Sequence, residues 1–147
     1  MFFLLIASLT SGCFYNSFGI RLDGNDVYQS MREDKYVLQI PCIVEKDGRY
    51  SKLIPLNVDA KYSDDVIILP AGTELSLEGI RLKVDAYYGL AKHLLANDFE
   101  VSCYLIGEMN GVPTIFNVDE LTLTKGNPAV HVEFDERYCK QVPLESE

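Results

Sequence analysis

The chain has 147 residues, of which 48% are hydrophobic and 24% are charged. This is the composition of an ordinary globular domain rather than a disordered segment, and the length predicts a single domain with its own core. The formal net charge of -9 argues against nucleic acid as a partner, because an acidic surface repels phosphate backbones. The same charge attracts a basic protein.

The first twelve residues contain no charged side chain and lead through small residues to Cys13. This run is too short to cross a bilayer, which needs about 20 apolar residues, but it has the length of a signal-peptide core. Residues 4–13 resemble a bacterial lipoprotein signal, in which a peptidase cuts before a cysteine that then carries lipid. The resemblance rests on the sequence LTSGC at residues 9–13, in which Thr10 occupies the place where leucine is usual.

The resemblance implies that residues 1–12 are removed as a signal peptide and that Cys13 carries fatty acyl chains such as palmitate. It places the protein in a bacterial cell envelope, and Phe14 in place of an aspartate favours the outer membrane, facing the periplasm. Residues 13–34 are expected to form the lipidated cysteine and a short tether, followed by one β-rich domain over residues 35–147. The alternative is that residues 2–9 form a buried strand and that Cys13 is an ordinary thiol.

Three cysteines remain beside Cys13, and their spacing matches neither a zinc site nor a redox pair. Cys42 and Cys103 each share a strand face with apolar residues, so both are expected in the core. Cys139 lies in the polar sequence DERYCKQ near the C-terminus. One interpretation is a disulfide between Cys103 and Cys139 that ties this tail to a core strand, and the other is a set of buried or half-buried thiols.

Alternating apolar and polar residues predict a mainly β domain. Residues 35–58 are expected to form two strands around a turn at Asp47-Gly48, and residues 99–118 a hairpin around Asn110-Gly111, because Asp-Gly and Asn-Gly supply the positive φ that tight hairpins need. Further strands are expected within residues 65–86, with a break at residues 70–72 and a turn at Gly79. A last strand is expected at residues 129–135.

Residues 86–96 interrupt the alternation, since apolar residues there recur at helical spacing between a potential capping residue, Asp85, and a terminating Asn97. They predict one short helix. The order of strands, helix, hairpin and strand resembles an OB-fold barrel, although an SH3-like barrel stays open. The expected fold is therefore a small antiparallel β-barrel or sandwich, OB-like or SH3-like, with one short helix near residues 86–96.

No residue pattern predicts catalysis. The two histidines, His93 and His131, are expected at the surface, and no G-x-S-x-G nucleophile motif occurs. Asp64-Asp65, Asp119-Glu120 and the sequence EFDE at residues 133–136 offer candidate carboxylate pairs, but Asp64-Asp65 is expected in a turn and the acids of EFDE on a solvated strand face. The acidic sequence LDGNDVY at residues 22–28 lacks the later glutamate of a calcium loop. The sequence therefore predicts a protein that is not an enzyme, with no catalytic residue, bound metal or cofactor.

Nine tyrosines and seven phenylalanines suggest a contact surface, because tyrosine buries area and keeps a hydrogen bond at the same time. The expected binding surface contains Tyr50, Tyr62 and Tyr104 together with the acidic residues Glu133 and Asp135. The first functional hypothesis is a lipid-anchored binding or scaffolding domain whose partner is either another envelope protein, expected to be basic, or an envelope polymer. The alternative is an inhibitor or immunity lipoprotein that blocks a basic toxic or lytic enzyme, and an envelope hydrolase ranks last.

Overall fold

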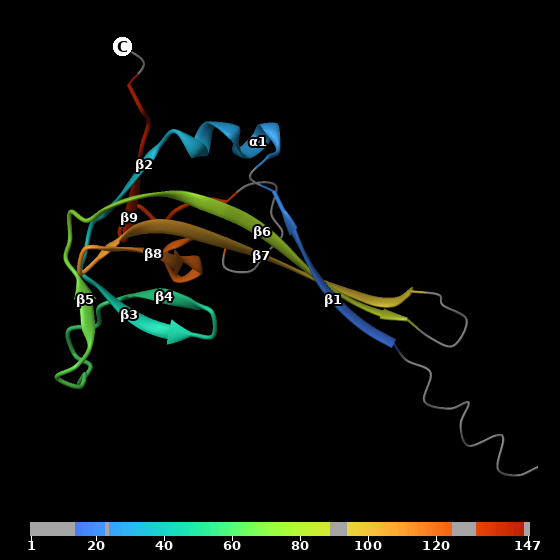
Figure 1. Ribbon diagram of the computed structural model, residues 1–147, viewed down its shortest axis with the longest axis horizontal. Helices are drawn as coiled ribbons and strands as arrows, with labels where there is room; N and C mark the ends of the chain where they lie inside the picture. Colours follow the sequence, from blue (N-terminus) through green and yellow to red (C-terminus); the bar gives the residue numbers. More distant parts are fainter. Residues whose placement is uncertain (1–13, 23, 89–93, 125–131, 146–147) are drawn as a thin grey trace, which may run out of the picture.

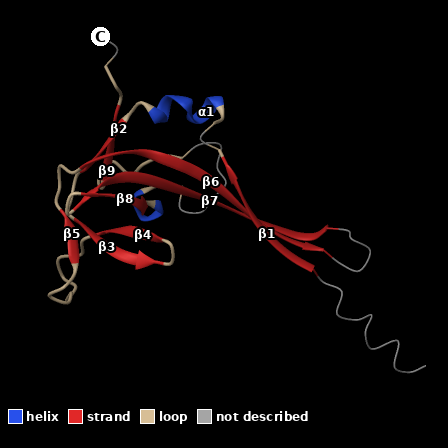
Figure 2. Cartoon of the chain, viewed as in Figure 1, coloured by secondary structure: helices blue, strands red, loops and turns tan. Residues whose placement is uncertain are grey.

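The computed structural model describes residues 14–22, 24–88, 94–124 and 132–145 (Figure 1). Strands make up most of these residues, so the expectation of a mainly β protein is confirmed (Figure 2). The strands are β1 (Phe14–Arg21), β2 (Lys35–Leu38), β3 (Cys42–Asp47), β4 (Tyr50–Pro55), β5 (Ile67–Leu69), β6 (Glu74–Tyr88), β7 (Leu94–Met109), β8 (Val112–Asn117) and β9 (Cys139–Val142). The helices are α1 (Asp26–Gln29) and two 3-10 turns, η1 (Ser30–Arg32) and η2 (Asp119–Leu121).

All nine strands belong to one sheet, in the order β5-β3-β4-β8-β7-β6-β2-β9, and β1 pairs with β6 beside β2. The sheet is not closed into a barrel. Neighbouring strands run antiparallel except for β4 and β8, which pair in parallel through Ser51↔Phe116 and Lys52↔Asn117. In Figure 1 the β3–β4 hairpin lies below the long β6–β7 hairpin, with β5 at one side. The single sheet therefore bends around its core as a small barrel does.

The predicted helix near residues 86–96 is wrong over the residues that the structure describes. Residues 86–88 end β6 and residues 94–96 begin β7, and the two strands pair from Ser76↔Ile106 to Tyr88↔Leu94. Residues 89–93 lie outside the described residues. An isolated helix of this length is marginal, whereas β6 gains a second ladder on its other side from β1, in the register Phe14↔Tyr88. Pairing on both sides therefore overrides the helical spacing.

The expected tether is also part of the folded domain. Residues 14–21 form β1, which hydrogen-bonds along β6 from Tyr88 to Arg81. The short helical segment that follows, α1 and η1, places Tyr28 and Met31 in the core, each about 5% exposed or less. The boundary expected at residue 35 is wrong for this reason, because residues 14–34 supply both a strand and core side chains.

Two further strand expectations need correction. Gly79 does not turn the chain; it lies within β6, where the register shifts by a bulge between Leu77 and Gly79. Of the strand expected at residues 129–135, residues 129–131 lie outside the described residues, and residues 132–135 form only a single bridge, Thr122↔Phe134. The last strand of the sheet is β9, which pairs with β2. The alternation of side chains nevertheless holds near Phe134, which is buried while Glu133 is exposed.

The core lies on one face of the bent sheet and is centred on Tyr36. Its ring is fully buried, packs on Phe134 at 4.8 Å between ring centroids, and its hydroxyl donates a hydrogen bond of 3.0 Å to the carbonyl of Met31. This bond satisfies the one polar atom that Tyr36 brings inside, as a buried hydroxyl requires. Burial raises the pKa of Tyr36 well above its ordinary value, so the ring stays neutral.

The two predicted hairpin turns are confirmed. Gly48 joins β3 to β4 at a φ of 60°, and Asn110 and Gly111 join β7 to β8 at φ values of 53° and 76°. Two consecutive residues with positive φ are the geometry of a type I′ turn, whose twist matches that of the flanking strands.

Replacing Gly111 by alanine is expected to destabilise the protein by about 1–2 kcal/mol, because a side chain at positive φ clashes with its own backbone. For a domain of this size the melting temperature should fall by about 3–6 °C, which differential scanning calorimetry measures. The matched control is Gly19→Ala, since a Cβ there meets no atom within 4 Å and φ is not positive. An unchanged melting temperature for Gly111→Ala would contradict the turn geometry.

Candidate functional site

Two of the three predicted tyrosines meet on the side of the sheet that faces away from the core. Tyr104 lies in β7 between the buried residues Cys103 and Leu105, so its side chain points to the opposite face. The Tyr50 ring, from the start of β4, lies 4.9 Å from the Tyr104 ring, centroid to centroid, at 55° between planes. A tilted pair at this distance is a favourable aromatic arrangement.

Arg81 of β6 joins the two rings. Its guanidinium carbon lies 4.8 Å from the Tyr104 centroid and 5.2 Å from the Tyr50 centroid, and Nη1 donates a hydrogen bond of 2.6 Å to the Tyr50 hydroxyl. Guanidinium groups stack on aromatic faces in this way. We call Tyr50, Arg81 and Tyr104 the tyrosine face. No local sequence pattern marks Arg81 as part of this site. Its side chain reaches Tyr50 of β4 although β7 and β8 lie between β6 and β4 in the sheet.

The electrostatics of the tyrosine face follow from Arg81. The hydrogen bond from Arg81 lowers the pKa of the Tyr50 phenol, although desolvation opposes this, and the same bond raises the pKa of Arg81. Nη2 of Arg81 also lies 3.6 Å from Oε2 of Glu78, an oxygen that is buried without a hydrogen bond. The positive charge of Arg81 is therefore balanced locally by Glu78, while Arg49 adds a second positive charge that also lowers the pKa of Tyr50.

The carboxylate pair Asp119-Glu120 borders this face and has a structural role. Asp119 accepts hydrogen bonds from the backbone N–H of Cys103 at 2.8 Å and from the side-chain amide of Asn117 at 3.0 Å. Glu120 forms an ion pair of 3.4 Å with Lys52 of β4. Asp119 thus fixes the chain that leaves β8 against β7, and Glu120 ties η2 to β4.

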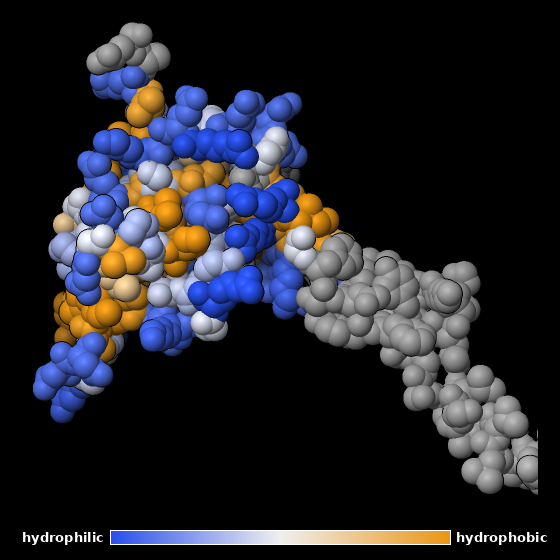
Figure 3. Space-filling model, in the orientation of Figure 1, coloured by the Kyte–Doolittle hydropathy of each residue, from blue (hydrophilic) through white to orange (hydrophobic). Residues whose placement is uncertain are grey.

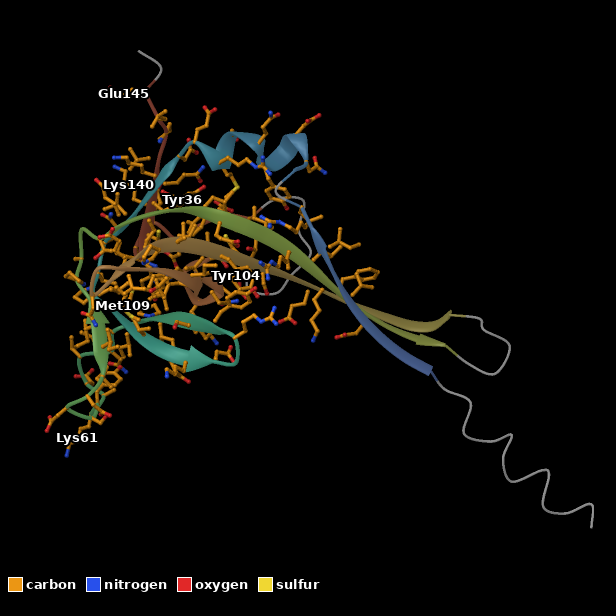
Figure 4. All side chains as sticks on the ribbon, viewed as in Figure 1. Tyr36, Lys61, Tyr104, Met109, Lys140 and Glu145 are labelled. Carbon is orange, nitrogen blue, oxygen red and sulfur yellow. The ribbon has the colours of Figure 1, made fainter. Side chains whose placement is uncertain are left out.

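The third predicted tyrosine lies elsewhere. Tyr62 is exposed in the loop between β4 and β5, where its hydroxyl accepts a hydrogen bond of 3.1 Å from the backbone N–H of Asn57. Figure 4 shows Lys61, the preceding residue, at the tip of this loop and far from the labelled Tyr104. The structure therefore does not bring Tyr62 together with the tyrosine face. Apolar surface gathers nearer to this loop, around β5, where Ile67 and Ile68 are exposed (Figure 3).

The two acidic residues of the predicted surface have different environments. Glu133 is exposed at a pocket of about 500 Å³, whose lining residues are Leu123, Val132, Glu133, Phe134, Glu136, Cys139 and Gln141. Asp135 is buried, at 7% exposure, which corrects its expected place on a solvated face. Its carboxylate accepts hydrogen bonds from Arg137, at 2.6 Å from Nη2 and 3.0 Å from Nε, and the bidentate pair holds the turn into β9.

The three described cysteines are free thiols, and all are buried. Burial raises the pKa of Cys42 to about 11 and that of Cys139 to about 12. Burial, followed by the nearby Asp119 carboxylate, raises the pKa of Cys103 well above its ordinary value. The expectation that Cys42 and Cys103 face the core is confirmed, while Cys139 is fully buried despite its polar sequence neighbours. The Cys103–Cys139 disulfide is not formed in this structure and stays a prediction.

Three further residues considered in the sequence, Cys13, His93 and His131, fall outside the part of the chain that the structure describes. Within the described part of the chain, no three histidine, cysteine or acidic side chains gather as a metal site, and no helix has the length and hydropathy to cross a membrane.

Comparison of the chain with protein-family models, curated proteins and solved structures finds no match.

Alkylation of the native protein with iodoacetamide at pH 8, followed by peptide mapping, is expected to leave Cys42, Cys103 and Cys139 unmodified. Their raised pKa values keep them as thiols at this pH, and the thiolate is the reactive form. In denaturant all three should react completely. Recovery of Cys103 and Cys139 as one linked peptide before reduction would show instead that the disulfide forms.

Proposed function

We propose that this protein is a binding domain of a bacterial cell envelope, anchored by lipid on Cys13, that contacts another envelope protein through the tyrosine face. The observation that carries the proposal is the stacking of Tyr50, Arg81 and Tyr104 on the side of the sheet that faces away from the core. In many protein interfaces a few residues supply most of the binding energy, and tyrosine and arginine are common among them. Tyr50 and Tyr104 are half-buried and already held in place.

Preorganisation explains why this cluster suits binding. A free tyrosine side chain loses rotational freedom when a partner immobilises it, at a cost of about 0.5–1.5 kcal/mol for each side chain. The hydrogen bond from Arg81 to Tyr50 and the contact between the rings already restrict both tyrosines. Because they project from different strands, β4 and β7, the backbone of the sheet also fixes their separation. A partner therefore meets a rigid aromatic surface.

The proposed partner is basic. The chain has a net charge of -9. At the tyrosine face Arg81 is paired with Glu78, and nearby Lys52 is paired with Glu120, while Arg49 adds a positive charge beside Tyr50. The excess carboxylates must therefore lie elsewhere on the surface, where they attract a basic protein over distances up to about 8–10 Å at ordinary salt. Association should accordingly slow as salt concentration rises, since electrostatic steering acts mainly on the rate of encounter.

A second candidate is an inhibitor or immunity lipoprotein that blocks a basic toxic or lytic enzyme. The specific observation in its favour is the pocket beside Glu133, since Glu136 also lines it and none of the described lining residues is a lysine or an arginine. An acid-lined pocket suits a basic side chain of such an enzyme. Both candidates share a basic protein partner, and they differ in whether binding abolishes an enzymatic activity of that partner.

A photo-crosslinking residue placed at Lys52, beside Tyr50 on β4, is expected to capture a discrete partner in host cells. The same residue placed at Lys61 should capture nothing, because that loop lies away from the tyrosine face (Figure 4). The double variant Tyr50→Ala/Tyr104→Ala should reduce the Lys52 crosslink at least tenfold, which quantitative mass spectrometry measures, while Tyr62→Ala leaves it unchanged. Equal crosslinking from both sites, or no effect of the double variant, would overturn the assignment.

The lipid anchor has a separate test. Replacing Cys13 by serine removes the only group that the proposed peptidase and acyl transfer could modify, so the variant should move from the membrane fraction to the soluble fraction. The intact mass of the wild-type protein from membranes should equal that of a chain beginning at Cys13 plus acyl groups. An unmodified mass that begins at Met1 would remove the anchor and the envelope location together.

A further inference from the structure

Three strands extend away from the rest of the sheet as an arm. Figure 1 shows β1 beside the end of β6 and the start of β7, with β1 along one side of the arm. β6 lies in the middle, since Phe18 pairs with Val84 and Val84 with Phe99. Among the described residues β1 pairs only with β6, and β7 pairs with β8 only from Tyr104 onward. Each outer edge of the arm therefore presents backbone N–H and C=O groups that no described strand satisfies.

The two edges of the arm differ in charge. The free part of β7 carries Asp98 and Glu100, whereas β1 reads FYNSFGIR and has no charge before Arg21. Natural edge strands avoid pairing with other chains through charges, prolines, bulges or short length. β1 has eight residues, no proline and an unbroken register with β6, and its Ile20 side chain is 45% exposed. The edge of β1 is therefore suited to pairing with another strand.

The two faces of the arm also differ. Alternate positions of β1 pair with uncharged residues of β6, namely Leu82, Val84, Ala86 and Tyr88. The positions between them pair with Arg81, Lys83, Asp85 and Tyr87. Alternate positions of a strand belong to opposite faces, so one face of this β1–β6 pair lacks charge and the other carries it. A strand added to β1 must match both faces, which restricts its register.

The edge of β1 is complementary to itself in one antiparallel register. A two-fold axis at Ser17 would place Ser17 opposite Ser17 of a second copy and Phe14 opposite Ile20 of that copy. Every pair then joins positions that belong to the same face of each arm, and Arg21 lies outside the paired residues. A slip by one residue would instead join the uncharged face of one arm to the charged face of the other.

We propose that a second copy of this chain pairs with β1 in this register and forms a two-fold symmetric dimer. Main-chain hydrogen bonds supply the affinity when a strand is added to a sheet edge. The two-fold arrangement uses each β1 edge once and closes at two copies, whereas pairing of β1 with β7 of another copy would continue without end. The dimer goes beyond the proposed function, because it uses neither the tyrosine face nor the lipid on Cys13.

Disulfide trapping tests the register. The full chain carries Cys13→Ser, and its other cysteines are buried. With Ser17→Cys added, oxidation by copper phenanthroline should link most chains into covalent dimers, because opposite residues of an antiparallel pair lie about 4.5–5.5 Å apart between Cα atoms, within reach of a disulfide.

The matched control for the trapping is Gly19→Cys, at a position with space for a Cβ and without positive φ. Two copies of this variant should not link, since residue 19 lies opposite residue 15 and the two cysteines would be roughly 13 Å apart along the strands. An equimolar mixture of Gly19→Cys and Tyr15→Cys chains should link, because these positions are opposite one another.

Sedimentation equilibrium of the Cys13→Ser chain should give twice the chain mass of 16.6 kDa. Ile20→Lys should raise the dimer dissociation constant at least tenfold, because charge on an edge strand opposes pairing. Its matched control is Ile68→Lys on the other edge strand β5, where the isoleucine is 47% exposed, and the constant should change less than twofold.

A monomer at all concentrations, equal linking of the Ser17→Cys and Gly19→Cys chains, or equal effects of the two lysine variants would each overturn the proposal. In host cells, a Ser17→Cys chain linked to a different protein instead of to itself would overturn it in favour of that protein.

Discussion

The antiparallel ladder between β6 and β7 is the constraint on which the rest of this fold depends. It runs from Ser76↔Ile106 to Tyr88↔Leu94, and every other part of the sheet is attached to it directly or through one of its neighbours. β1 and β2 pair with the free edge of β6, and β8 pairs with the free edge of β7. A strand hydrogen-bonded on both edges leaves few backbone groups unsatisfied, which is why the two longest strands hold this central position.

The ladder also separates the chemistry of the domain into two faces. Ile80 and Cys103, opposite one another in the ladder, point into the core with Tyr36 and Phe134. Arg81 and Tyr104, their immediate neighbours in sequence, point to the other face and meet Tyr50 there. Strand geometry alone requires this alternation. The same pairing that builds the core therefore positions the residues proposed to contact a partner.

The surface expected from sequence as one acidic, tyrosine-bearing region divides into two. At the tyrosine face Arg81 is paired with Glu78 and nearby Lys52 with Glu120, while Arg49 adds a positive charge beside Tyr50. The carboxylates Glu133 and Glu136 lie instead at a pocket next to β9, which four strands of the sheet separate from β4. A partner that engaged both regions would gain aromatic contact at one and charge pairing at the other, and the two contributions would respond differently to salt.

Local chemistry in the sequence determined the mainly β class, the turns at Gly48 and Asn110-Gly111, and the burial of Cys42 and Cys103, because side-chain alternation and positive φ are properties of a few adjacent residues. Tertiary structure decided the rest. Residues 86–88 and 94–96 have helical spacing but form strands, since β1 supplies a ladder from more than 60 positions away along the chain in the register Phe14↔Tyr88. The contact between Tyr50 and Tyr104 depends on the strand order, because β8 lies between their strands. Such contacts join distant segments, so no local pattern records them, and only the packed sheet brings them together.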